Sequence, residues 1–121
     1  MKEGILSSTI ISMVRNRQEA LEIAAKARKG LERIYSDRLR GVYLYGSAAR
    51  DQITPDSDID IAVILDRITS RYLEHKRTSK LGSDLSLDAT TLITFLFVGE
   101  TDFQNGRFSV HQAIKSEGIR A

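Results

Sequence analysis

The stretch LYGSAARDQITPDSDIDIAVIL, residues 44–65, decides both the fold and the candidate site of this chain. A Gly-Ser pair ends one short β-type run, and ten residues later two aspartates lie inside a second run that is otherwise apolar. Aspartate is depleted in strands, and carboxylates are rarely buried unless something pairs with them. The two aspartates therefore need a chemical explanation rather than a packing one.

Asp58 and Asp60 are two residues apart, so on a strand their side chains point to the same face, roughly 6–7 Å apart at a rise of about 3.3 Å per residue. Ile59 and Ile61 then face the core. Two carboxylates side by side repel one another and resist burial, and a divalent cation between them removes that penalty. Hard oxygen ligands of this kind suit Mg²⁺, which keeps several waters and is completed by substrate phosphates.

Gly46 and Ser47 lie where the strand expected over residues 41–45 gives way to a turn. A glycine lets a ligand approach the backbone closely. The serine hydroxyl and the free amides at the start of a helical turn form an anion site, and Arg50 adds a charge-assisted contact to phosphate. A phosphate-binding turn beside a pair of metal-binding carboxylates indicates a nucleotide–metal site.

Two other phosphate or metal motifs fail on position. A P-loop needs a second glycine five residues after Gly46, where this chain has Asp51. An EF-hand beginning at Asp56 needs glycine at its sixth position and glutamate at its twelfth, which here are Ile61 and Arg67. Both motifs are excluded.

The rest of the chain predicts a small α/β (α+β) domain with a short mixed sheet flanked by helices. Asn16 and Glu19 have the spacing of a capping box, and Gly30 weakens the helix that follows them. We expect one domain over residues 1–121, with residues 1–16 as an N-terminal helical lead-in. The expected elements are helix, strand, strand, helix, strand and helix, over residues 17–36, 41–45, 58–65, 70–86, 89–98 and 107–121.

Composition narrows the function further. The 121 residues include no cysteine, which excludes disulfides and thiolate metal sites and fits a cytoplasmic protein. No apolar run approaches the length of a membrane span, so no membrane role is expected. The net charge of +2 gives no reason to expect nucleic acid as a direct substrate. His75 and His111 have no partner at metal-ligand spacing and are expected at the surface.

The motif resembles the minimal nucleotidyltransferase (MNT) family of the polymerase-β-like nucleotidyltransferase superfamily. The resemblance rests on Gly46-Ser47, the spacer AARDQITPDS and Asp58-Ile59-Asp60, and it spans residues 20–121. It implies metal-dependent transfer of AMP from ATP to a hydroxyl, with Ser47 on the triphosphate and Asp58 and Asp60 on two Mg²⁺ ions. Asp51 departs from the family, which commonly has glycine there; the acid would either weaken phosphate attraction or point to solvent.

The resemblance also implies a third carboxylate on a neighbouring strand. Asp88, at the start of the strand expected over residues 89–98, is the candidate third catalytic residue and metal ligand. Thr90 shares a face with Asp88, and the alignment with the family pattern puts Thr90 nearer to the acidic position. If Thr90 holds that position, the site lacks its third carboxylate.

Small stand-alone members of the family act as antitoxins paired with a HEPN-domain toxin. We therefore expect this chain to transfer AMP to a hydroxyl of such a partner. Two alternatives stay open, a catalytically degenerate module that neutralises its partner by contact and a transferase acting on a small molecule. The acceptor, the nucleotide preference and the oligomeric state do not follow from the sequence.

Overall fold

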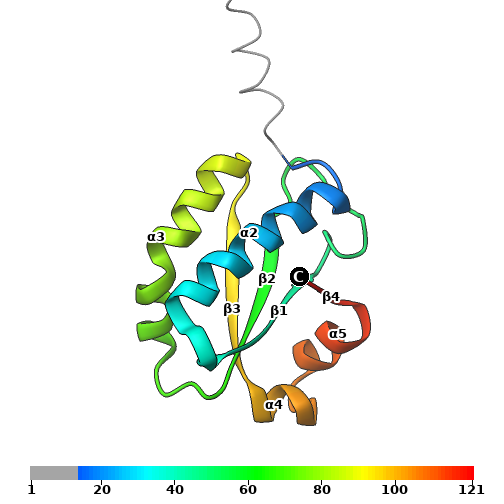
Figure 1. Cartoon of the computed structure of the whole chain (residues 1–121). Helices are drawn as coiled ribbons and strands as arrows, with labels where there is room; N and C mark the ends of the chain where they lie inside the picture. The colour runs from blue at the N-terminus through cyan, green and yellow to red at the C-terminus, as the bar shows by residue number, and fades with distance from the viewer. Residues whose placement is uncertain (1–13) are drawn as a thin grey trace, which may run out of the picture.

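The computed structural model describes residues 14–121, and Figure 1 shows how their helices and strands are arranged. Most of the lead-in expected to be helical, residues 1–16, lies outside the described residues, and residues 14–15 near its end are not helical. Within the described part, no helix is both long enough and apolar enough to cross a lipid bilayer.

A four-stranded mixed sheet forms the centre of the fold (Figure 1). Its strands are β1 (Leu39–Tyr45), β2 (Ile59–Leu65), β3 (Ile93–Gly99) and β4 (Ile119–Arg120), in the spatial order β3-β2-β1-β4. Strands β2 and β3 run parallel, whereas β1 is antiparallel to both β2 and β4. The predicted fold class is confirmed, but the two-residue strand β4 was not expected.

Helices cover the two faces of the sheet. Helices α2 (Arg17–Tyr35) and α3 (Arg71–Ala89) pack on one face, and α4 (Glu100–Asn105) and α5 (Ser109–Glu117) lie against the other. A single 3-10 turn, η1 (Ser36–Arg38), joins α2 to β1. The N-cap of α2 is Asn16, as predicted.

Strand β2 is buried on both faces, and its side chains alternate between two cores. Ala62 and Ile64 join the core beneath α4 and α5, so Asp60 points to that same side. Helix α4 follows the C-terminal end of β3, so it lies away from the start of the parallel strand β2 (Figure 1). The opposite core, beneath α2 and α3, takes Ile59, Ile61, Val63 and Leu65.

Gly30 lies where α2 packs tightly against α3. A Cβ atom at this position would lie 2.6 Å from the Cδ1 atom of Leu81. The glycine costs about 1 kcal/mol in helix propensity relative to alanine. It also allows the two helices to pack together over the sheet, which the helix pattern alone did not reveal.

Helix α3 ends later than the sequence pattern predicts, at Ala89 rather than at residue 86. Thr90 caps the helix in a left-handed conformation with φ of 54°, and its amide donates to the carbonyls of Ser86 and Leu87. The sequence pattern predicts a strand from residue 89, but β3 begins at Ile93. This shift decides where Asp88 lies.

The helical spacing of residues 70–86 predicts that Tyr72, Leu73, Leu81 and Leu85 face the core, but the buried face of α3 is different. Tyr72 and Leu73 are exposed, and Glu74 is buried in their place. The Glu74 carboxylate accepts hydrogen bonds from the Tyr35 hydroxyl at 2.7 Å and from Arg77 at 2.9 Å. Burial alone would raise the pKa of Glu74, but these hydrogen bonds outweigh burial and hold its pKa below the ordinary value.

The C-terminal segment contains one expected helix and one unexpected one. Helix α5 ends at Glu117 with Gly118 as its C-cap, inside the predicted range of residues 107–121, whereas α4 forms in residues 100–105, where no helix was predicted. His111 was expected at the surface but is buried, and its Nδ1 accepts a hydrogen bond from the amide of Phe108 at 3.4 Å. His75 is exposed, as expected.

Candidate active site

The turn after β1 has the geometry of an anion site. Gly46 leaves the strand with φ of 73°, and one helix-like turn follows, closed by hydrogen bonds from the Arg50 amide to the Gly46 carbonyl and from the Gln52 amide to the Ser47 carbonyl. Buried alanines at residues 48–49 anchor the turn to the core. The amides of residues 47–49 have no hydrogen-bond partner in the described part of the chain, so they are available to a ligand.

Gly46 is also in close contact with one of the two aspartates. Asp60 is paired with Tyr45, the residue before Gly46, in the antiparallel register of β1 and β2. A Cβ atom at Gly46 would lie only 2.5 Å from the Oδ2 atom of Asp60, closer than real Cβ contacts. Position 46 therefore needs glycine for two reasons, its left-handed backbone and the carboxylate beside it. The predicted phosphate turn and the predicted metal ligand lie side by side.

Only Asp60 of the predicted pair lies within β2, because the strand begins at Ile59. Asp58 lies just before β2 and is exposed, whereas Asp60 is half-buried. Ile59 and Ile61 between and after them are fully buried. Because Asp58 has no hydrogen-bond or ion-pair partner among residues 14–121, its carboxylate is free to bind a cation.

Arg50 was predicted to contact phosphate, and in this structure its guanidinium is engaged elsewhere. Its Nη1 atom lies 3.1 Å from the carboxylate of Glu117 at the end of α5, and its Nε donates to Gln52. Both partners of this ion pair are about half exposed, and exposed pairs of this kind contribute about 0–1 kcal/mol. Such a weak pair can be exchanged for a phosphate, so the role of Arg50 stays a prediction.

Asp51, the departure from the family pattern, has a structural function that neither expected alternative described. Its φ of 58° is left-handed, which explains why a glycine suits this position. Its carboxylate accepts a hydrogen bond from the amide of Arg17, in the first turn of α2, at 2.9 Å. The negative charge thus lies at the positive end of the α2 dipole and joins the phosphate turn to that helix.

The expected position of Asp88 at the start of the third strand is wrong. Asp88 lies in the last turn of α3 and is exposed, because the helix continues past residue 86. Thr90, the alternative, is the C-cap of the same helix. The catalytic role predicted for Asp88 depended on a position in the third strand, which this residue does not have.

The residue beside Asp60 on the neighbouring strand is Thr94, which the sequence analysis did not single out. Asp60 and Thr94 are partners in the parallel register of β2 and β3. The Thr94 hydroxyl donates to Oδ1 of Asp60 at 2.9 Å. No group of three Asp, Glu, His or Cys side chains that could hold a metal occurs within residues 14–121.

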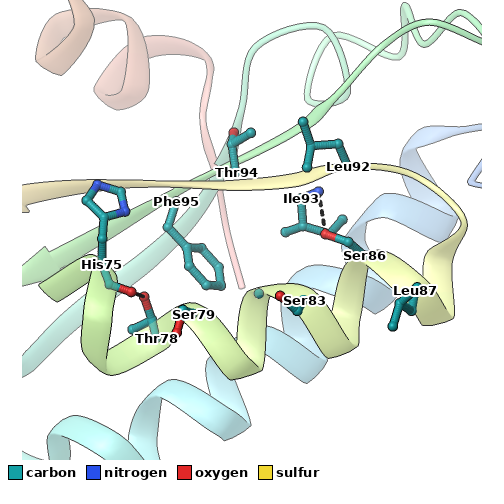
Figure 2. Close-up of a pocket in the computed structure, with 11 residues that line it drawn as sticks. His75, Thr78, Ser79, Ser83, Ser86, Leu87, Leu92, Ile93, Thr94 and Phe95 are labelled. Carbon is teal, nitrogen blue, oxygen red and sulfur yellow. Dashed lines mark hydrogen bonds between the residues drawn. The ribbon is translucent and has the colours of Figure 1, made fainter.

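A groove of about 680 Å³ lies between α3 and the free edge of β3 and includes Thr94 in its wall (Figure 2). Figure 2 shows Thr94 and Phe95 on opposite sides of β3, with Phe95 directed toward α3. The side chains that α3 contributes are hydroxyls, Leu87 and His75. The groove therefore supplies no carboxylate to the site.

Tyr45 flanks Asp60 on the other side. It packs against the core beneath α4 and α5. Burial raises the pKa of Tyr45, and the negative charge of Asp60 raises it further. The phenol therefore stays neutral at physiological pH and is not suited to act as a base.

The donor set fits a magnesium ion that arrives with a nucleotide. Asp58 and Asp60 offer hard carboxylate oxygens, and Oδ2 of Asp60 faces the turn in which the phosphates would lie. Mg²⁺ in proteins is commonly held by one or two carboxylates together with substrate phosphates and waters. The residues present satisfy that requirement for one such ion.

Comparisons with known proteins agree with this geometry. The model of the nucleotidyltransferase domain family matches residues 24–116. A curated protein of Methanocaldococcus jannaschii, named as a putative protein adenylyltransferase, is 29% identical over 83 residues, which are 69% of this chain and 83% of that protein.

Two solved structures share the fold. One is a toxin–antitoxin structure with AMP-PNP, which is 21% identical, has a TM-score of 0.57 and covers 78% of this chain and 68% of its own. The other is a mutant of the toxin–antitoxin pair MntA–HpeT, also 21% identical, with a TM-score of 0.55 and coverage of 78% and 70%. Since the family model spans well over half of the residues, the chain belongs to the nucleotidyltransferase domain family, and the membership predicted from Gly46-Ser47 and Asp58-Ile59-Asp60 is confirmed.

Proposed function

We propose that this chain transfers the AMP unit of ATP to a hydroxyl group of a partner protein, a HEPN-domain toxin, and acts as its antitoxin. The observation that carries the proposal is the contact between the Gly46 turn and Asp60, which brings a phosphate site and a metal ligand together. The protein adenylyltransferase name of the relative and the toxin–antitoxin assemblies that share the fold support the choice of acceptor. The lack of cysteine supports a cytoplasmic location.

Each residue of the site has a separate part in binding ATP. Gly46 allows the triphosphate to approach the backbone, and Ser47 and the free amides after it donate hydrogen bonds to phosphate oxygens. Arg50 exchanges its exposed pair with Glu117 for a phosphate contact. Asp58 and Asp60 hold Mg²⁺, which, when bound, neutralises the charge that develops on the phosphates.

The reaction is a single displacement at the α-phosphorus. The acceptor oxygen forms a bond to the α-phosphorus, the bond between this phosphorus and the oxygen bridging to the β-phosphate breaks, and pyrophosphate leaves. The acceptor hydroxyl loses its proton to water or buffer, because no carboxylate beyond Asp58 and Asp60 is grouped with the site in residues 14–121. In such transfers the protein acts mainly by positioning groups and by neutralising charge.

The lack of a third carboxylate also favours a second candidate, a module that neutralises its partner by contact alone. Co-expression with a candidate HEPN-domain toxin separates the two candidates. Intact mass measurement of the purified toxin should show added adenylyl units that are missing when Asp58 and Asp60 are both changed to asparagine. If the double variant still protects cells while the toxin is unmodified in both cases, contact alone explains neutralisation.

A further inference from the structure

Asp60 on β2 is paired with Tyr45 on β1 and with Thr94 on β3. These two neighbours determine the surroundings of its carboxylate within the sheet. Neighbouring strands are about 4.7–4.9 Å apart, so a side chain on the same face at position 94 is the closest strand neighbour that Asp60 has on the β3 side. That neighbour is a threonine, and its hydroxyl already donates to Oδ1 of Asp60 at 2.9 Å.

The two oxygens of Asp60 therefore face different surroundings. Oδ2 lies against Gly46 and the phosphate turn, where a cation bound to the triphosphate would be. Oδ1 is directed toward β3 and is engaged by a neutral donor. A second cation on the β3 side would meet Oδ1, and holding it there would need a further anionic ligand.

No such ligand is found on that side among the residues that the structure describes. The nearest acidic residue before Thr94 in the sequence, Asp88, is exposed in the last turn of α3. Across residues 14–121, no third Asp, Glu, His or Cys completes a metal-binding group. The described residues therefore supply no third charged ligand for a cation on the β3 side of Asp60.

We infer that the site binds one divalent cation per nucleotide rather than two, and that Thr94 is the positioning residue that sets this number; the inference rests on the proposed function. Thr94 acts by holding Oδ1 of Asp60 with a neutral hydrogen bond. A carboxylate at position 94 would remove the hydrogen bond and add the missing charge. The variant Thr94→Asp should therefore take up a second cation.

The test counts Mn²⁺ ions bound with a non-hydrolysable ATP analogue to the full chain, by electron paramagnetic resonance and by equilibrium dialysis. The wild-type chain should hold one Mn²⁺ per bound nucleotide, and Thr94→Asp should hold two, with the spin coupling of ions a few ångströms apart. Thr101→Asp, which adds the same charge at an exposed position of α4, is the matched control and should hold one.

The outcomes separate the inference from the function on which it rests. Two coupled Mn²⁺ ions in the wild-type chain would overturn the inference while leaving the nucleotide site intact, and this count does not depend on whether any variant folds. A folded Thr94→Asp that holds only one ion would overturn the role of Thr94. If the wild-type chain binds neither nucleotide nor Mn²⁺, the proposed function itself is wrong. Thermal unfolding of Thr94→Asp should also move to higher temperature with Mn²⁺, since the cation relieves repulsion from Asp60.

Discussion

An alanine at position 46 should both destabilise the chain and weaken the binding of Mg·ATP. The left-handed backbone at Gly46, with φ of 73°, costs a residue with a Cβ atom about 1–2 kcal/mol. The new Cβ atom would lie 2.5 Å from Oδ2 of Asp60, so the carboxylate must move. Movement breaks the hydrogen bond from Thr94, and bonds to charged groups contribute about 1.5–3 kcal/mol. We expect the free energy of unfolding to fall by about 2.5–5 kcal/mol in total.

Urea denaturation measures the stability loss of Gly46→Ala, and calorimetry with Mg·ATP measures its affinity at a temperature where the variant is folded. Gly99→Ala is the matched control, because a Cβ atom there meets nothing within 4 Å and φ is −72°; its stability should change by no more than about 0.5 kcal/mol. Displacement of Asp60 should cost Gly46→Ala at least about tenfold in affinity, or roughly 1.4 kcal/mol. Wild-type affinity in Gly46→Ala, or a stability loss equal to that of Gly99→Ala, would refute the account of this turn.

Four further changes test other parts of the site and fold. The double variant Asp58→Asn, Asp60→Asn should lose Mg²⁺-dependent nucleotide binding but no stability, since like-charge repulsion is relieved; unchanged Mg·ATP affinity by calorimetry would contradict the site. Ser47→Ala should weaken triphosphate binding by about 1–2 kcal/mol, the contribution of one hydrogen bond to a charged group. Asp88→Asn should leave AMP transfer unchanged because its side chain is exposed on α3, and a hundredfold loss would restore its predicted catalytic role. Glu74→Gln should destabilise the chain by about 1–3 kcal/mol in urea at pH 7 without changing nucleotide affinity. Because the pKa of Glu74 is lowered from its ordinary value of 4.5, this difference from wild type should be present above pH 4.5 and shrink as the pH falls below it.

The motif could be predicted from the sequence because its parts are close together along the chain. Gly46 and Asp60 are brought into contact by the antiparallel pairing of β1 and β2, and the period of two on a strand places Asp58 and Asp60 on one face. The P-loop and the EF-hand could be excluded because Asp51 and Ile61 stand where these motifs need glycine. Contacts between residues that are close along the chain can be inferred from one sequence.

The neighbour of Asp60 on β3 could not be predicted in the same way. The parallel register between β2 and β3 depends on where α3 ends, and Thr90 ends it in a left-handed conformation that is unusual for a β-branched residue. The sequence pattern predicts this strand from residue 89, whereas β3 begins at Ile93, so the prediction puts Asp88 rather than Thr94 beside the site.

The burial of two polar side chains, Glu74 and His111, was also not predicted from the sequence. Glu74 reads as a surface residue of an amphipathic helix, and its burial depends on Tyr35, Arg38 and Arg77, which come from two other segments and from α3 itself. His111 is similar, since the amide of Phe108 compensates its burial. Such partners become visible only when the elements are packed together.

The most direct measurement of the central claim follows the radiolabel from ATP to the partner toxin. The chain, Mg²⁺ and the toxin are incubated in parallel with ATP labelled at the α-phosphate and with ATP labelled at the γ-phosphate, and the toxin is then isolated. If AMP is transferred through the Gly46 turn and the Asp58–Asp60 pair, the α-label alone should remain on the toxin, and the double asparagine variant should transfer neither label. Transfer of the γ-label, or no label on the toxin while the chain binds Mg·ATP, would contradict the account.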